Sequence, residues 1–476
     1  MSIVADQLGA RQRRAAAVCS LAGILAGCVG YQAAPLEPAR SADEFAARRL
    51  DDPQLRDEII RILPQAAKSW PQALDRAELL AIALLRNPQL AVAHAQLHAA
   101  LAHEITVAEP PQPDLTLESE YAHHDAHPWL YGLELNWLLR SPERRRLETE
   151  IARLDTSDAR LLLMDQAWTV RRELAAALSD AKSARRRLDL FDRLAQAQDR
   201  LLALERQRVQ AGEDPPSELI AAEQARIEIE QQQAELRALA DAAQVAVAKT
   251  LGLPPQALDG VSFEWPDWGD PPAVTEEKRR ATREQALLSR ADLGIAIQDY
   301  AAAEAKLQLA IARQYPQFEL EPGYYWDHGI AKYPFDVGFT LPFNGNKGEI
   351  AEARAGRELA GQRMLALQGG IYGEIAAAER AEEIARASTA AAQRQLRAAQ
   401  QQQQQADLSL RLGASGPQDQ VGADIAVMRA ELAAVQMQAQ LQTARNNLED
   451  ALHAPLSGPE LALAKSPSGI AAGAGS

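Results

Sequence analysis

Cysteine is nearly absent from this chain, and aromatic residues are scarce. Cys19 and Cys28 are the only cysteines among 476 residues, so a framework of disulfides is excluded. Phe, Trp and Tyr together make up 5% of the residues, whereas Ala, Leu, Gln, Glu and Arg dominate. This composition is typical of long helices in coiled-coil packing rather than of a compact enzyme core.

The chain also lacks long apolar runs and an excess of positive charge. Beyond the first 28 residues no stretch approaches 18 consecutive apolar residues, so the sequence predicts no transmembrane helix. The formal net charge is −15 at pH 7, which disfavours a nucleic acid as partner. Neither a nucleophile–base pair nor a phosphate-binding loop stands out. We therefore expect no enzyme, no catalytic residue and no cofactor.

The N-terminus has the layout of a secretory signal. Three arginines precede an apolar run over residues 15–26, which is too short to span a bilayer permanently. The run ends in Leu25-Ala26-Gly27-Cys28, which resembles a bacterial lipobox. The resemblance implies removal of residues 1–27 and acylation of Cys28, anchoring the chain in outer-membrane lipid, and Val29 does not favour inner-membrane retention. Ordinary cleavage that leaves Cys28 unmodified is the alternative.

What the chain does have is an internal duplication. The segment Leu84-Leu85-Arg86-Asn87-Pro88-Gln89-Leu90 aligns with Leu287-Leu288-Ser289-Arg290-Ala291-Asp292-Leu293, about 200 residues later. Gly212 and Pro216 align in the same way with Gly413 and Pro417. The sequence thus predicts two repeats, at 74–252 and 276–454. A lead or equatorial segment (28–73), a Trp- and Pro-rich connector (253–275) and a flexible tail (455–476) complete the chain.

Each repeat is predicted to have the same elements in the same order. Apolar residues alternate with polar ones in two short segments, which indicates a β-hairpin, and Gly and Pro mark the helix ends. The first repeat should contain a helix at 74–107, a hairpin at 115–137, a long helix at 143–211, a tip at 212–216 and a return helix ending at 251. The second should contain a helix at 276–314, a hairpin at 318–341, a long helix at 347–412, a tip at 413–417 and a return helix at 418–452.

The lengths of these helices predict how each repeat is built. A helix over 143–211 is on the order of 100 Å long, and it carries a heptad seam rich in alanine. The two shorter helices of a repeat, placed end to end, match one long helix in length. Each repeat should therefore be a rod with a hairpin at one end and a Gly/Pro tip at the other.

The hairpins are too small to be complete by themselves. Four strands cannot close a barrel, but three chains supply twelve, an even number within the range of outer-membrane barrels. Aromatic residues at the strand ends suit the two membrane interfaces. The alternative is a pair of soluble hairpins whose aromatic residues pack a small core.

The tips and one strand-to-helix segment carry a family resemblance. The turn Gly212…Ser217-Glu218-Leu219, its repeat at Gly413…Asp424, and the duplication resemble the outer-membrane factor family of efflux channels typified by TolC. The stretch 341–351 (LPFNGNKGEIA) is similar to the cation-efflux, CzcC-like branch. The first repeat departs from that form at 138–142.

The resemblance implies a mainly α-helical fold with a small β part. It implies a homotrimer with a twelve-stranded barrel in the outer membrane and a periplasmic α-helical barrel. Its partners would be a periplasmic adaptor (membrane fusion) protein and an inner-membrane pump of the resistance-nodulation-division type. The channel would be a passive conduit for small molecules or metal cations. A lipid-anchored periplasmic adaptor is the alternative function.

The resemblance also implies roles for the tips. The residues expected to contact the adaptor are Arg208, Gly212, Pro216, Arg411, Gly413 and Pro417. Glu218 and Asp419 are expected to form a periplasmic gate, since threefold rings of carboxylates filter cations, although exposed acidic residues are ordinarily just solvated. His94 and His98 are spaced as a metal pair could be, and His123, His124 and His127 crowd one turn. Ordinary solvated histidines account for them, so no metal site is expected.

Overall fold

The computed structural model describes residues 30–64, 70–124 and 126–464. The chain divides into two compact units, residues 1–47 and 48–476, and each is described by itself. The described part of the first unit contains the short helix α2 (Pro38–Ala46), in which no residue is buried. The predicted signal and Cys28 lie outside the described residues, so their roles stay predictions.

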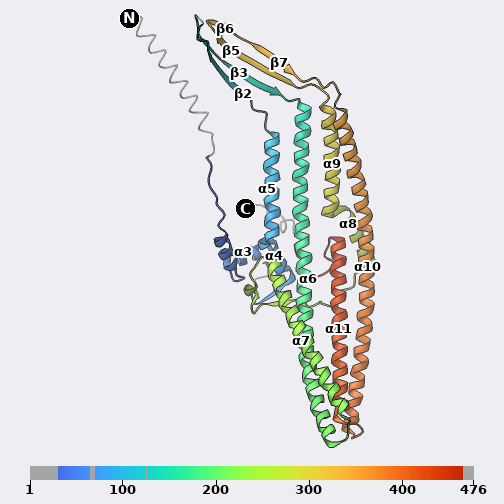
Figure 1. Cartoon of the computed structure of the whole chain (residues 1–476). Helices are drawn as coiled ribbons and strands as arrows, with labels where there is room; N and C mark the ends of the chain where they lie inside the picture. Colours follow the sequence, from blue (N-terminus) through green and yellow to red (C-terminus); the bar gives the residue numbers. More distant parts are fainter. Residues whose placement is uncertain (1–29, 65–69, 125, 465–476) are drawn as a thin grey trace. The chain divides into compact units, whose positions relative to one another are not determined.

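Two long helical hairpins make up about half of the second unit (Figure 1). The first consists of α6 (Pro142–Ala211) and α7 (Pro216–Leu251), and the second of α10 (Lys347–Arg411) and α11 (Pro417–Leu452). Gly212 and Gly413 have φ angles of 76° and 71°, a left-handed conformation that glycine adopts without strain, and a proline begins each returning helix. In the part of the chain that the structure describes, no helix is long and apolar enough to cross a membrane.

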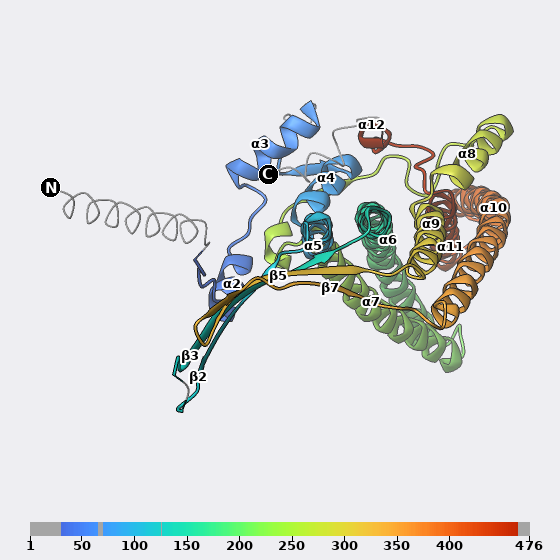
Figure 2. The same ribbon diagram turned by 90° about the horizontal axis from the view of Figure 1, so that it is seen from above.

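The helices of this unit pack side by side in a definite order. α6 packs against α5 (Pro88–Ala108) and α7 on one side, and against α9 (Ala291–Ala312) and α11 on the other. α10 follows, in contact with α9 and α11, and Figure 2 shows the row from above. α6 is therefore interior, whereas α10 lies at an edge. There it exposes the apolar side chains Leu359, Leu365, Tyr372 and Ile384.

Two pairs of helices stack end to end, one pair in each repeat. α5 begins where α7 ends, and there the Asn87 side chain caps α5 and donates a hydrogen bond to the Thr250 carbonyl oxygen at 2.7 Å. α9 begins where α11 ends, and Arg290 donates to the Ala451 carbonyl oxygen at 2.8 Å. The prediction that two shorter helices stack beside one long helix is confirmed.

The predicted helices at 74–107 and 276–314 are each interrupted, which the sequence analysis missed. The first is α4 (Arg76–Arg86) followed by α5, because Asn87 precedes a proline and takes the extended backbone favoured there. The second is α8 (Glu276–Ser289) followed by α9, with the break at Arg290. Arg290 precedes no proline, but its side chain is 7% exposed and held by contacts to α10 and α11.

The long strands form one antiparallel sheet at the end of the hairpins opposite the Gly/Pro tips (Figure 1). The sheet order is β2 (Asp114–Tyr121), β3 (Trp129–Leu139) and β5 (Phe318–Asp327), after which β6 (Ile330–Lys332) and β7 (Phe335–Phe339) both pair with β5. Pro334 separates β6 from β7, since proline has no N–H to donate to a ladder. The sheet joins the two repeats through β3 and β5. Its edges are β2 and the interrupted β6–β7 strand.

Short elements pack on the helices near the end-to-end joints. α3 (Pro53–Ile62) buries Leu55 and Ile59 completely, and β1 (Ala73–Asp75) pairs in parallel with β4 (Ser262–Glu264) of the connector. The connector also contains the 3₁₀ helix η2 (Pro255–Leu258). The described part of the lead (28–73) is therefore partly folded, since it contains α2, α3 and β1.

The expected flexible tail also differs from the structure at its start. Leu456 packs in one apolar core with Leu448 and Ile371. Leu463, in α12 (Leu461–Ala464), packs in another core with Leu55 and Ile59. Residues 456–463, here called the C-terminal strap, therefore connect the core of the second repeat to that of the first. No local pattern indicated this, because the three leucines of this short segment show neither helix nor strand periodicity.

Candidate functional site

The sheet has two chemically different faces, and one of them is apolar. Side chains alternate along a strand, and residues directly opposite on neighbouring strands share a face. Leu117 pairs with Leu133, which pairs with Tyr324, so all three lie on one face. The same register gives this face the following side chains, each at least 39% exposed: Leu115, Leu117, Tyr121, Trp129, Tyr131, Leu133, Trp137, Leu139, Phe318, Phe335, Val337 and Phe339.

The opposite face of the sheet is acidic. The register places eight carboxylates on it: Asp114, Glu118, Glu120, Glu134, Glu319, Glu321, Asp327 and Asp336. Glu134 accepts a hydrogen bond from the Tyr325 hydroxyl at 2.6 Å, and Lys332 pairs with Asp327. The Tyr325 ring lies over Gly132, where an added Cβ would be 2.2 Å from a ring carbon. Only glycine at 132 leaves room for this ring.

Such a sheet fits a boundary between hydrocarbon and water. A broad exposed apolar surface is unfavourable in water, whereas carboxylates cannot be left in hydrocarbon. Strands of outer-membrane barrels alternate in this manner, with apolar residues outward and polar residues toward the lumen. The soluble-hairpin alternative is not favoured, because the apolar face packs no core of its own.

The predicted tip residues lie at the turns of the two hairpins. Gly212 directly follows α6, Gly413 lies two residues after the last residue of α10, and Pro216 and Pro417 are the first residues of α7 and α11. Glu218 and Asp419 are exposed in the first turns of the returning helices, on different tips. The Asp419 carboxylate accepts the Gly416 N–H at 3.0 Å, so it also caps α11. Glu218 makes no corresponding cap.

Arg208 is used inside the first tip, a role that the sequence analysis missed. Its Nε and Nη2 contact the two Asp214 carboxylate oxygens at 2.5 and 3.0 Å, and its Nη1 lies 3.3 Å from Glu213. The hydrogen bond from Arg208 lowers the pKa of Asp214. Burial, followed by the charge of Asp214, raises the pKa of Glu205. This network braces the first tip.

The second tip has a different surface. Aligned on the two tip glycines, Ala406, Ser409, Ala414 and Ser415 stand where the first tip has Glu205, Arg208, Glu213 and Asp214. Within the described residues Arg411 makes no ion pair, and its neighbour Leu412 is 74% exposed. The first tip is therefore acidic and internally braced, whereas the second is nearly neutral with an exposed leucine.

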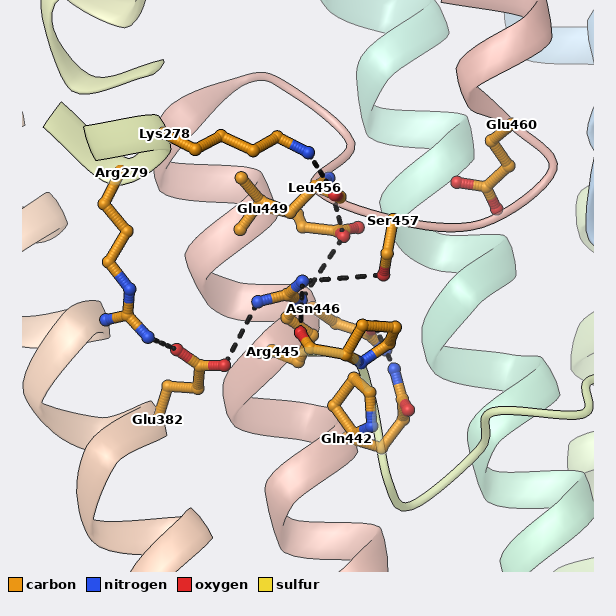
Figure 3. Close-up of polar contacts among 12 residues, drawn as sticks. Lys278, Arg279, Glu382, Gln442, Arg445, Asn446, Glu449, Leu456, Ser457 and Glu460 are labelled. Atoms are coloured by element: carbon orange, nitrogen blue, oxygen red, sulfur yellow. Dashed lines mark hydrogen bonds and ion pairs between the residues drawn. The ribbon is translucent and has the colours of Figure 1, made fainter. Parts of the chain in front are cut away.

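A buried polar centre lies beside the helix joints (Figure 3). Glu382 of α10 is fully buried and accepts hydrogen bonds from Arg279 at 2.9 Å, Arg386 at 2.9 Å and Arg445 at 3.1 Å. Next to it, Arg171 of α6 binds Glu449 at 2.5 Å and Glu460 at 2.9 Å. We call Arg76, Arg171, Arg279, Glu382, Arg386, Arg445, Glu449 and Glu460 the transverse charge cluster. Its members are scattered along the sequence, so no local motif points to it.

The histidines are not brought together into a metal centre. The rings of His123 and His124 lie 4.6 Å apart in the turn after β2, while His94 and His98 lie on α5. In the described ranges, no group of three His, Cys, Asp or Glu side chains could hold a metal ion.

Comparison with known proteins connects this architecture to a family. The model described as outer membrane efflux protein matches residues 79–253 and 282–453, which are the two repeats. A comparison with curated proteins found no match. Because both repeats match, the alternative of a periplasmic adaptor protein is not favoured.

Solved structures share the fold at low sequence identity. The outer-membrane channel OprN has a TM-score of 0.66 at 20% identity, covering 90% of this chain and 98% of its own. The outer membrane protein VceC from Vibrio cholerae has a TM-score of 0.65 at 17% identity, covering 80% and 97%. The MtrE outer membrane channel from Neisseria gonorrhoeae has 0.64 at 19%, covering 80% and 89%. The likeness to these structures, together with the match of both repeats, agrees with the predicted mainly α-helical fold, and the chain belongs to the outer membrane efflux protein family.

Proposed function

We propose that the chain is one subunit of a passive, homotrimeric channel that carries small molecules or metal cations outward through the outer membrane. The two-faced sheet is the observation that carries this proposal. Its apolar face suits lipid and its acidic face suits a water-filled lumen. One chain supplies β2, β3, β5 and the interrupted β6–β7 strand, so three copies supply twelve.

The edges of the sheet support closure by further copies. β2 and the β6–β7 strand each leave one side unpaired in a single chain, and open strand edges are not tolerated in hydrocarbon. Pairing the β2 edge of one copy with the β7 edge of the next is a head-to-tail contact, and such contacts generate a ring when the rotation between copies closes.

The helices offer the same kind of contact. α5 and α7 end the row on one side and α10 ends it on the other. Ile227 and Leu239 of α7 are exposed, as are Leu365 and Tyr372 of α10. In a head-to-tail ring these two edges cover each other, giving a helical barrel continuous with the strand barrel.

The tips are the proposed docking surface for a periplasmic adaptor, which would connect the channel to a pump of the resistance-nodulation-division type. Gly212, Pro216, Gly413 and Pro417 shape this surface. Because Arg208 is engaged by Asp214, we assign it the role of bracing the tip, while the exposed Arg411 and Leu412 are available to the partner. Glu218 and Asp419 are the proposed gate.

Cys28 is the proposed lipid anchor. The lipobox-like segment that ends in it supports this role. Metabolic labelling with an alkyne fatty acid should mark the natural chain and leave a Cys28→Ala chain unmarked. Label retained by the Cys28→Ala chain would remove the assignment.

The narrower resemblance to the cation-efflux branch stays a prediction. The acidic lumen face of the sheet supports it, because a wall of carboxylates raises the local concentration of cations. Export phenotypes of a deletion strain across metals and drugs would identify the cargo.

The channel proposal is tested by purification and reconstitution. Detergent extracts of outer membranes should contain heat-labile trimers, and planar bilayers containing them should conduct ions. A monomeric, water-soluble periplasmic species without conductance would overturn the proposal.

A further inference from the structure

The transverse charge cluster connects elements that are far apart in the sequence. Arg171 of α6 contacts both Glu449 of α11 and Glu460 of the C-terminal strap, with side chains no more than 6% exposed. Glu460 also lies 3.9 Å from Arg76 of α4. On the other side of α11, Arg445 links the cluster to Glu382 of α10. The cluster thus crosses the helix row from one repeat to the other at a single level.

The C-terminal strap is fixed to the same place. The Leu456 N–H donates to Glu449 at 2.9 Å, and the Leu456 carbonyl oxygen accepts from Lys278 of α8 at 3.0 Å (Figure 3). Ser457 lies beside Arg445, and Glu460 follows within the same segment. The strap therefore adds its own charge and its own backbone to the contact between the repeats.

The helices that the cluster crosses, α6 and α11, also meet through apolar side chains, a hydrogen bond from Trp168 to Asp450 at 2.9 Å and the partly exposed Arg193–Glu431 pair. Buried alanines recur along α6, at Ala167, Ala177, Ala184 and Ala195, and along α11, at Ala430, Ala434 and Ala444. Apolar contacts between long helices can re-form with other partners when one helix slides by a heptad, about 10 Å. A buried polar contact has no equivalent after such a slide, so it selects one alignment.

We propose that Arg171, Glu449 and Glu460 form a register lock that fixes the axial position of α11 against α6. The lock sets the height of the second tip relative to the first. Sliding of α11 away from the tips is already blocked, because α9 is stacked on its end at Ala451 and Arg290. The lock therefore opposes movement of α11 toward the tips. The importance of level tips for adaptor docking rests on the proposed function, but the lock itself does not.

The test is a distance measurement between the tips of the full chain. Spin labels on the cysteines of Ala211→Cys and Ala414→Cys, both at exposed positions, report the separation of the two tips by pulsed electron resonance. Labelled chains are diluted with unlabelled ones so that one pair is read per assembly, and a sample without the introduced cysteines gives the background. The lock variant is Arg171→Met with Glu449→Gln, which removes both charges but keeps an acceptor for the Leu456 N–H.

A matched control is available on the same two helices. Arg193 of α6 and Glu431 of α11 form an ion pair at 2.8 Å, but it is partly exposed, at 56% and 26%. The control variant Arg193→Met with Glu431→Gln makes the same chemical changes there. The natural chain and the control should each give one narrow distance distribution. The lock variant should give a second population or a broad distribution, displaced by up to about 10 Å, one heptad rise.

Two results would overturn the lock. One is a lock variant that keeps the single narrow distribution, whether or not its melting temperature falls. The other is a control variant that broadens as much as the lock variant. If the double variant does not fold, the milder Glu460→Gln is measured in its place. If Glu460→Gln keeps a single narrow distribution of tip-to-tip distances while its melting temperature falls, the cluster stabilises the fold without fixing the position of α11.

Discussion

Asn87 and Arg290 occupy the same position in the two repeats and do the same task with different chemistry. Asn87 lies at the break before α5 and donates a hydrogen bond to the Thr250 carbonyl oxygen at the end of α7. Arg290 lies at the break before α9 and donates to the Ala451 carbonyl oxygen at the end of α11. Asn87 is neutral, whereas Arg290 also contacts Asp292 at 2.6 Å and Glu374 of α10 at 3.3 Å. The second joint is thus connected to a third helix by charge.

Loss of the Arg290 side chain should destabilise the protein measurably. Arg290→Ala removes hydrogen bonds to two carboxylates and to a buried carbonyl group, so we expect a cost of about 2 kcal/mol. The control is Arg380→Ala, whose pair with Glu383 is exposed at 78% and 65% and should be worth about 0.5 kcal/mol or less. Denaturant unfolding of detergent-solubilised protein, followed by circular dichroism, compares them. Equal effects would mean that Arg290 does not secure the joint.

Neighbouring residues of β2 should respond in opposite ways to the same substitution. Leu117 lies on the apolar face and Glu118 on the acidic face. An arginine on the lipid side costs about 2–4 kcal/mol near the middle of the membrane. Leu117→Arg should therefore reduce insertion into the outer membrane, measured by fractionation and protease protection.

Glu118→Arg is the partner experiment. It should insert normally but lower the cation preference of the channel, measured by reversal potentials in planar bilayers. Normal insertion of Leu117→Arg, or loss of insertion in Glu118→Arg, would show that the two faces have been assigned the wrong way round.

Neutral gate residues should change ion flow. Alanine at 419 would also remove the hydrogen bond that this side chain accepts from the Gly416 N–H, so Asp419→Asn is preferred, since the asparagine side-chain oxygen also accepts. Together with Glu218→Gln it should raise single-channel conductance or weaken cation preference. Glu230→Gln, on the shaft of α7, serves as the control. Traces indistinguishable from those of the natural channel would exclude the two residues from the gate.

Asp158 should make stability depend on pH. Burial, followed by the negative charges of Asp299 and Asp155, raises its pKa to about 6. The folded state therefore holds this proton more tightly than the unfolded chain does. Stability from this group is full below about pH 4 and decreases as the pH rises through 6.

Asp158→Asn should remove that decrease. Melting temperatures of the natural protein and of Asp158→Asn, measured from pH 4 to pH 7.5, give the comparison. The variant should be the more stable of the two above pH 6. A parallel pH dependence in both proteins would assign the effect to other groups.

Local sequence patterns predicted those helices, turns and strands whose formation depends on residues near one another in the sequence. The helix at 143–211 lacks proline and glycine in its interior, Gly212 and Gly413 need a left-handed backbone, and the strands alternate with period two. All of these are visible within a window of a few residues. The predicted and observed bounds of α6, α7, α10 and α11 accordingly agree within a residue or so.

The parts that the sequence analysis missed depend on contacts between distant segments. Arg290 breaks a helix without proline because it bonds to Ala451. Glu382 is buried because arginines from α8, α10 and α11 converge on it, and Arg208 is occupied by an aspartate across the turn. None of these residues differs locally from the solvated arginines and glutamates that surround it in the sequence.

The edge of α10 is uncovered in a single chain, with several apolar side chains exposed. In the proposed trimer, neighbouring copies cover its exposed apolar side chains and the two open edges of the sheet, so the free energy of folding would include that of assembly. In the proposed trimer this has a genetic consequence. A variant that folds but has charged substitutions on the exposed apolar face of α10 would assemble into trimers together with natural chains. At equal expression only about one ring in eight would contain three intact copies, so such a mutation should be dominant.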